Sequence, residues 1–167
     1  MTKQHMFTQT AFTAFLILVT MFTPASADST TSRYLAFQSF SLHFRNFDEL
    51  NGINPTLGLE VSPRSGLGWQ AGVFQDSFEQ LSGYAGINYT FASYARGNLR
   101  ARLLGVANLT YKQFHKNQAP EARLIPLPAI ELKTIRQVYV NLSVVPEIGG
   151  KKYHTNGLIY LQFKLKL

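Results

Sequence analysis

The sequence contains no cysteine, so no disulfide scaffold can hold its fold together. Charged residues make up only 15% of the chain and hydrophobic residues 46%, a balance that argues against disorder. After residue 27, no apolar run approaches the ~20 residues that a transmembrane helix needs. With 167 residues, the chain is long enough to form one domain with a sizeable buried face.

Familiar chemical motifs are missing as well. The sequence has no P-loop, helix-turn-helix or zinc-finger spacing, so nothing in it points to nucleic acid. It also has no GxSxG elbow, no HExxH and no metal-ligand cluster, which leaves soluble hydrolase chemistry without support. The net charge is +7, which suits an anionic lipid or polysaccharide partner; a basic surface that only aids solubility explains it equally well.

The first 27 residues have the features of a secretory signal peptide. Lys3 opens a short polar start, residues 11–22 are mostly apolar, and residues 25–27 offer a small-x-small cleavage site. We therefore expect a cleaved signal over 1–27 and one exported domain over 28–167.

From Tyr34 onward, apolar and polar residues alternate with a period of two, which predicts β-strands. In the segment 99–112, for example, Leu103 and Leu109 fall on one face and Arg102 and Asn108 on the other. Eight segments show such alternation. The strands that we expect are 33–44, 55–62, 67–76, 82–91, 99–112, 123–132, 137–145 and 157–167.

The joins between these segments alternate in length. Those at 63–66, 92–98 and 133–136 are shorter; those at 45–54, 113–122 and 146–156 are longer, with 77–81 as a short exception. Outer-membrane barrels show this asymmetry. A secreted β-sandwich would give the same alternation within strands, but closure removes the exposed sheet edges. We predict an all-β, eight-stranded antiparallel up-and-down transmembrane β-barrel.

Three polar residues fall together in this topology. His43 ends the first expected strand and Asp76 the third, and Ser77 follows; the ends of these strands share a rim. Alternation turns His43 and Asp76 toward the lumen. A histidine near a carboxylate and a hydroxyl could perform acyl transfer, with the imidazole moving the proton of an attacking alcohol. A hydrogen-bonded rim cluster without chemistry is the alternative interpretation.

Prolines mark a different part of the wall. Pro126 and Pro128 lie inside the sixth expected strand, and Pro146 ends the seventh. Because proline cannot donate a hydrogen bond to the ladder, these residues predict a local gap in a closed barrel. Such a gap could admit a lipid chain sideways from the membrane. A twisted strand end near the aqueous rim would explain the prolines too.

The stretches "FQDSFEQLSGYAG" (74–86), "LIPLPAIEL" (124–132) and "YHTNGLIYLQFKLKL" (153–167) resemble the lipid A palmitoyltransferases, a family of outer-membrane enzymes. The resemblance implies an eight-stranded barrel in the outer membrane of a Gram-negative bacterium. It implies transfer of a palmitoyl or similar chain from a phospholipid to the lipid A of lipopolysaccharide, without a metal or soluble cofactor. We expect the protein to be a membrane-embedded monomer.

The resemblance also assigns roles to residues. It implies that His43, Asp76 and Ser77 are catalytic, and that Tyr84 and Ala85 lie at the floor of the acyl pocket. Ala85 stands where the family usually has glycine, so its methyl group would shorten the accepted chain. Two other functions stay open: a lipid A deacylase, which releases fatty acid, and a non-catalytic barrel used for adhesion or wall stability.

Overall fold

The computed structural model describes residues 31–44, 50–115, 118–145 and 157–167. The expected signal peptide, 1–27, and Pro146 lie outside the described residues. In the described part of the chain, no helix is long and apolar enough to cross a membrane. The strands are β1 (Thr31–His43), β2 (Ile53–Pro63), β3 (Gly66–Gln75), β4 (Leu81–Arg96), β5 (Leu99–Lys112), β6 (Glu121–Ile135), β7 (Val138–Val145) and β8 (Leu158–Lys166).

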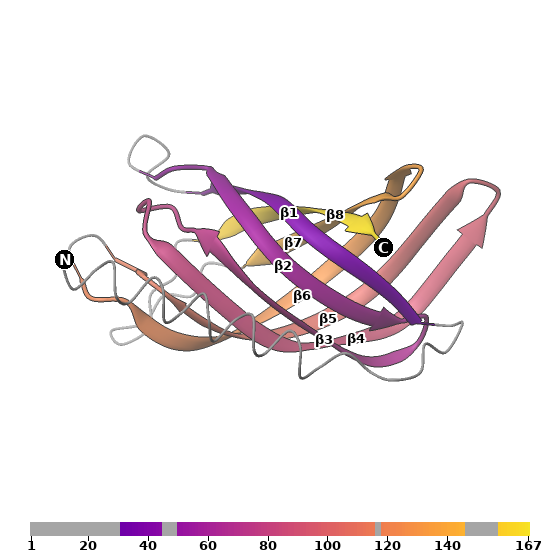
Figure 1. Ribbon diagram of the computed structural model, residues 1–167, viewed down its shortest axis with the longest axis horizontal. Helices are drawn as coiled ribbons and strands as arrows, with labels where there is room; N and C mark the ends of the chain where they lie inside the picture. The colour runs from indigo at the N-terminus through magenta and orange to yellow at the C-terminus, as the bar shows by residue number, and fades with distance from the viewer. Residues whose placement is uncertain (1–30, 45–49, 116–117, 146–156) are drawn as a thin grey trace.

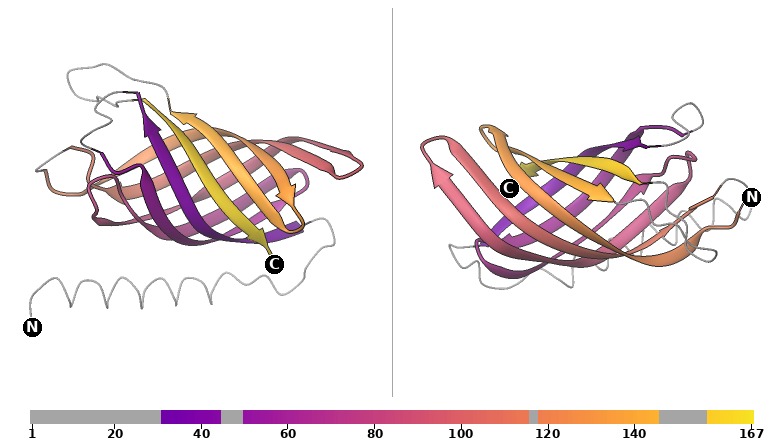
Figure 2. Two further views of the ribbon diagram at one scale, coloured as in Figure 1. Left: turned by 90° about the horizontal axis from the view of Figure 1, so that it is seen from above. Right: turned by 180° about the vertical axis from the view of Figure 1, so that it is seen from behind.

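These strands form a closed antiparallel barrel in which each strand pairs with its neighbours in sequence. The barrel closes because β1 pairs with β8 as well as with β2, and β1 and β8 run side by side in Figures 1 and 2. The predicted all-β, eight-stranded antiparallel barrel is therefore confirmed.

Two strands extend furthest beyond the bounds that the alternation predicted. β4 continues to Arg96 and β6 runs from Glu121 to Ile135, so the expected joins at 92–98 and 133–136 shrink to tight turns. Gly97 and Arg136 occupy these turns with φ angles of 56° and 46°. At Gly97 the absence of a side chain removes the steric cost of that conformation. The asymmetry of the joins is thus sharper than expected, and it divides the barrel into a short-turn end and a long-join end.

The wall is largely apolar outside and polar inside. Large hydrophobic side chains are exposed on the outer face of most strands, among them Leu42, Leu57, Leu67, Phe91, Leu109, Leu124 and Leu142. The lumen buries polar residues such as Ser39, Asn88 and Gln162. A closed barrel with this distribution is compatible with an outer-membrane protein, because lipid can cover the outer face and strand pairing satisfies the backbone.

A bulge in β1 sets which of its residues face the lumen. Its pairing with both neighbouring strands shifts between Ala36 and Gln38. Ala36 is buried, whereas Phe37 and Phe40 are 44% and 37% exposed, so the alternation changes phase at this point. A bulge inserts one residue and re-aims the side chains that follow. As a result, the later part of β1 turns His43 inward at the long-join end.

Charged residues lie inside the lumen near the short-turn end. Lys164 Nζ donates to Glu60 Oε2 at 2.7 Å and to Glu131 Oε2 at 2.6 Å. Arg102 forms a two-pronged ion pair with Glu131, each bond 2.7 Å long. The Tyr34 ring lies near both cations, 4.5 Å from Lys164 Nζ and 5.4 Å from the Arg102 guanidinium carbon. The two cations and two carboxylates balance one another, as buried charges require.

Candidate functional site

His43 and Ser77 meet at the long-join end of the lumen. His43 Nε2 and Ser77 Oγ are 2.9 Å apart, within hydrogen-bond distance, and both residues are buried. β1 supplies the histidine, and the join between β3 and β4 supplies the serine. The backbone carbonyl of Ser77 also accepts a hydrogen bond from Asn51 N, which ties the serine to the end of the β1–β2 join. The two residues therefore converge in space, as their places in the topology predicted.

A second hydroxyl completes a small network around the pair. Ser41 Oγ lies 3.3 Å from His43 Nε2 and 3.4 Å from Ser77 Oγ, and it donates to Asn54 Oδ1 at 2.9 Å. The Asn54 amide is itself oriented, because its Nδ2 donates to the Gln75 carbonyl. Since the Ser41 hydrogen goes to Asn54, Ser41 can act only as an acceptor toward the imidazole and Ser77. The sequence prediction included neither Ser41 nor Asn54, although alternation along β1 places Ser41 on the same face as His43.

Asp76 occupies a different place from the one expected of a catalytic carboxylate. It is fully buried, and its oxygens accept hydrogen bonds from the backbone N–H groups of Phe78, Gln80 and Gln113 and from the Ser82 hydroxyl, at 2.9–3.1 Å. Among the described residues, none of its hydrogen bonds goes to His43. Local bonding of this kind is how aspartate holds a turn. Asp76 therefore fixes the β3–β4 join to β5 and positions Ser77, its neighbour in sequence.

Lys112 brings a positive charge to the same rim. It is the last residue of β5, lines the same cavity as Ser77, and interacts electrostatically with both His43 and Asp76. Its ammonium lies 5.2 Å from the Phe114 ring centre, and the Arg123 guanidinium lies 4.3 Å from the same ring. The sequence prediction passed over Lys112, although alternation along β5 places it on the polar, lumenal face.

A narrow cavity runs down the lumen from Ser77. Its volume is about 110 Å³. Most of the surface of its lining is apolar, although polar side chains outnumber the apolar ones, which are Phe74, Val106, Ile125, Leu127, Ala129, Val145 and Leu158. Hydrogen-bonded polar side chains also line it: Gln70 donates to Asn108, and Gln162 donates to the Tyr84 hydroxyl. The cavity therefore suits a linear apolar chain whose polar end stays at the rim.

Among the described residues, the strand pairing of the wall beside this cavity is incomplete. β6 pairs with β5 along 121–132, but its pairing with β7 begins only at Ala129 and Ser143. Beyond that point Val144 and Val145 of β7 pair with β8 alone. Pro126 and Pro128 lie in the part of β6 that β7 leaves unpaired. The predicted gap thus lies between β6 and β7, next to cavity-lining residues of both strands.

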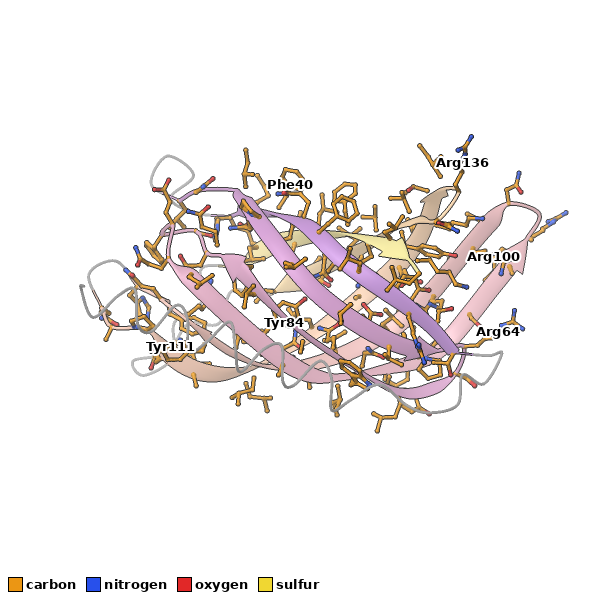
Figure 3. The ribbon with its side chains drawn as sticks, viewed as in Figure 1. Phe40, Arg64, Tyr84, Arg100, Tyr111 and Arg136 are labelled. Atoms are coloured by element: carbon orange, nitrogen blue, oxygen red, sulfur yellow. The ribbon has the colours of Figure 1, made fainter. Side chains whose placement is uncertain are left out.

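The side chains of the two residues expected at the pocket floor point to opposite faces of the barrel wall. Tyr84, labelled in Figure 3, points into the lumen, and its hydroxyl lies so close to Gly58 and Gly72 that a side chain at either position would collide with it. Ala85 follows with the opposite orientation and is exposed on the outer face. Its methyl group therefore cannot shorten the cavity. Strict alternation along β4 puts Tyr84, and not Ala85, in the lumen.

Among the described residues, no three histidine or carboxylate side chains converge in a way that could hold a metal ion. A search of protein-family models and of curated proteins finds no match for this chain. The interpretation of the site therefore rests on its geometry.

Proposed function

We propose that this protein is a membrane acyltransferase that moves a fatty acyl chain from a phospholipid to a hydroxyl group of lipid A. One observation carries the proposal: a buried histidine–serine pair, 2.9 Å apart, lies at a narrow cavity with mainly apolar walls. A serine hydroxyl in contact with imidazole is the usual arrangement of an activated nucleophile. The cavity holds the acyl chain and leaves its ester group at the rim.

The pair accounts for each proton in the transfer. His43 Nε2 accepts the Ser77 proton as Oγ bonds to the carbonyl carbon of the donor ester. When the donor's C–O bond breaks, His43 gives this proton to the departing oxygen, and a lysophospholipid leaves. The acceptor hydroxyl then attacks the acyl-serine and passes its proton through His43 back to Ser77. These two ester exchanges balance without an oxidant or a reductant.

Lys112 is suited to hold the donor. A phospholipid carries its phosphate a few atoms from the ester carbonyl, so a donor chain seated in the cavity brings its phosphate to the rim. Lys112 provides a partly buried cation there, where electrostatic attraction is stronger than in water. This position favours a phosphate-bearing donor over a neutral ester.

The gap between β6 and β7 supports delivery of the lipid from within the bilayer. The outer face of the wall is largely apolar, and the cavity lining includes Leu127 on one side of the gap and Val145 on the other. Within the described parts of β6 and β7, a chain passing at this point crosses no ladder of backbone hydrogen bonds. This arrangement suits an outer-membrane enzyme that takes its substrate sideways from the membrane.

The proposal is tested by following a labelled acyl group from phosphatidylcholine to lipid A with purified, folded protein in detergent. Replacing His43 or Ser77 with alanine should lower transfer by roughly 10²–10⁴-fold, because general acid–base catalysis is worth about that much. His115→Ala and Ser65→Ala make the same chemical changes away from the pair and should transfer at the wild-type rate.

Product analysis separates transfer from its alternatives. Acylated lipid A together with lysophospholipid is the expected outcome. Release of free fatty acid without acylation of lipid A would replace the proposal by a hydrolase. Wild-type transfer by folded Ser77→Ala protein would contradict the assigned nucleophile, and no lipid product from the wild-type protein would point to a non-catalytic barrel.

A further inference from the structure

A second cavity opens at the short-turn end of the barrel. Its volume is about 560 Å³, far more than that of the narrow cavity beside Ser77. The ion pair of Glu131 and Arg102 contributes to its lining, and three further cations line it as well: Arg64, Arg100 and Lys166. Arg64 and Arg100 are labelled at the same end of the molecule in Figure 3.

The charges of the buried ion-pair network beside this cavity cancel, but those of its three further cations do not. Glu131 is bonded to Arg102 and Lys164, and Glu60 to Lys164. The remaining carboxylate side chains of the described residues, at positions 76, 79 and 121, belong to the long-join end. Three cations, Arg64, Arg100 and Lys166, therefore give the cavity a net positive charge that no described carboxylate side chain at this end offsets.

A projecting hairpin forms one wall of the cavity. β3 pairs with β4 only as far as Thr90, and β6 pairs with β5 only from Ala101 onward. Between these limits the ends of β4 and β5 pair with each other alone and extend past their neighbours, as Figure 1 shows. This arm presents Ser93, Tyr94 and Arg100 to the cavity. Its hydroxyl groups thus lie alongside the cations.

We propose that this cavity binds a phosphate-bearing ligand. Guanidinium groups match the oxygens of phosphate in a two-pronged geometry, and the Lys166 ammonium adds a further donor. Hydroxyl groups of Ser32, Ser93 and Tyr94 suit the glycerol or sugar part of such a ligand. The volume falls within the ~300–1,000 Å³ usual for small-molecule sites. The inference is independent of the proposed acyl transfer, because the two cavities lie at opposite ends of the lumen.

The ligand's phosphate could come from a soluble compound or from a lipid headgroup, and the test has one arm for each. In the first arm, full-length protein in zwitterionic detergent is titrated calorimetrically with inorganic phosphate and with glycerol 3-phosphate at low salt. In the second arm, binding of the protein to phosphatidylglycerol vesicles is compared with its binding to phosphatidylcholine vesicles. Either source supports the inference, and failure of the wild-type protein to bind in both arms would overturn it.

Charge-matched variants separate a site from diffuse attraction. Arg64→Gln/Arg100→Gln removes two cavity cations, whereas Arg96→Gln/Arg136→Gln removes two from the same end that do not line the cavity. The cavity variant should bind phosphate at least tenfold more weakly, roughly what the loss of one charge-assisted bond costs, and the control variant should bind like wild type. Equal weakening in both would overturn the site. If the double cavity variant does not fold, the two single variants are compared with Arg96→Gln instead.

Discussion

The two ends of the lumen use polar residues in opposite ways. At the short-turn end, two cations and two carboxylates bind one another inside the lumen through bonds of 2.6–2.7 Å. At the long-join end, His43 bonds to neutral hydroxyl groups, and Asp76 is bonded to backbone amides and a serine. The first group pairs each of its charges within itself, while the second leaves a serine hydroxyl facing a cavity.

The polar residues at the two ends of the lumen therefore differ in whether they serve mainly stability or mainly catalysis. Buried charges cost free energy unless each finds a partner, so removing one member of the short-turn network exposes the others to that cost. The free energy of folding depends less on the histidine–serine pair, because removing a hydroxyl group or the imidazole leaves no unpaired buried ion. We therefore expect substitutions at one end to affect mainly folding, and substitutions at the other to affect mainly activity.

The largest expected effect is on stability. Glu131→Gln removes the carboxylate shared by Arg102 and Lys164 and should lower the free energy of unfolding by about 3–5 kcal/mol. Glu121→Gln, which breaks the partly exposed ion pair with Arg123, should lower it by only about 0–1 kcal/mol. Urea unfolding of both variants in the same lipid or detergent gives the comparison. Equal losses would mean that the buried network does not stabilise the barrel.

A smaller effect is expected from closing the gap between β6 and β7. If the pairing of β6 with β7 continued by one residue beyond Ala129 and Ser143, Pro128 would lie opposite Val144. Pro128→Cys and Val144→Cys therefore place two thiols opposite each other on the outer face of the wall. A reducible cross-linker between them should slow acyl transfer by roughly tenfold or more, because closure of a lipid entrance can limit turnover. Reduction should restore the rate.

The natural control is the adjacent pair Ile130→Cys/Leu142→Cys. These residues already face one another across the intact ladder, so linking them closes nothing. Because the chain has no cysteine of its own, each cross-link is unambiguous. Undiminished transfer by the fully cross-linked P128C/V144C variant would exclude this gap as the lipid route.

Much of the fold could be predicted because alternation is a local signal. The strands and the lumenal orientation of His43 and Lys112 follow from a period of two. The bulge of β1 could not be predicted, since Phe37 and Phe40 are both apolar and fit either face. The length of β4 was missed because the strand structure of residues 92–96 depends on pairing with β5.

The site was harder to predict because its contacts join distant segments. Proximity of His43 and Ser77 follows from topology, but the partners of Asp76 depend on the turn that it forms and on the adjacent end of β5. The ion pairs of Lys164 depend on the register of strands that are far apart in sequence. Ala85 was placed at the pocket floor by resemblance, whereas the alternation of β4 turns it outward.

The most direct test of the account measures how far the effects of His43 and Ser77 depend on each other. Acyl-transfer rates are compared for His43→Ala, Ser77→Ala and the double variant, with folding verified by the gel shift of the unboiled barrel. If the two residues act as one unit, the double variant should be no slower than the slower single variant, because either substitution already removes the activated nucleophile. Losses that multiply in the double variant would show independent roles and contradict the proposed pair.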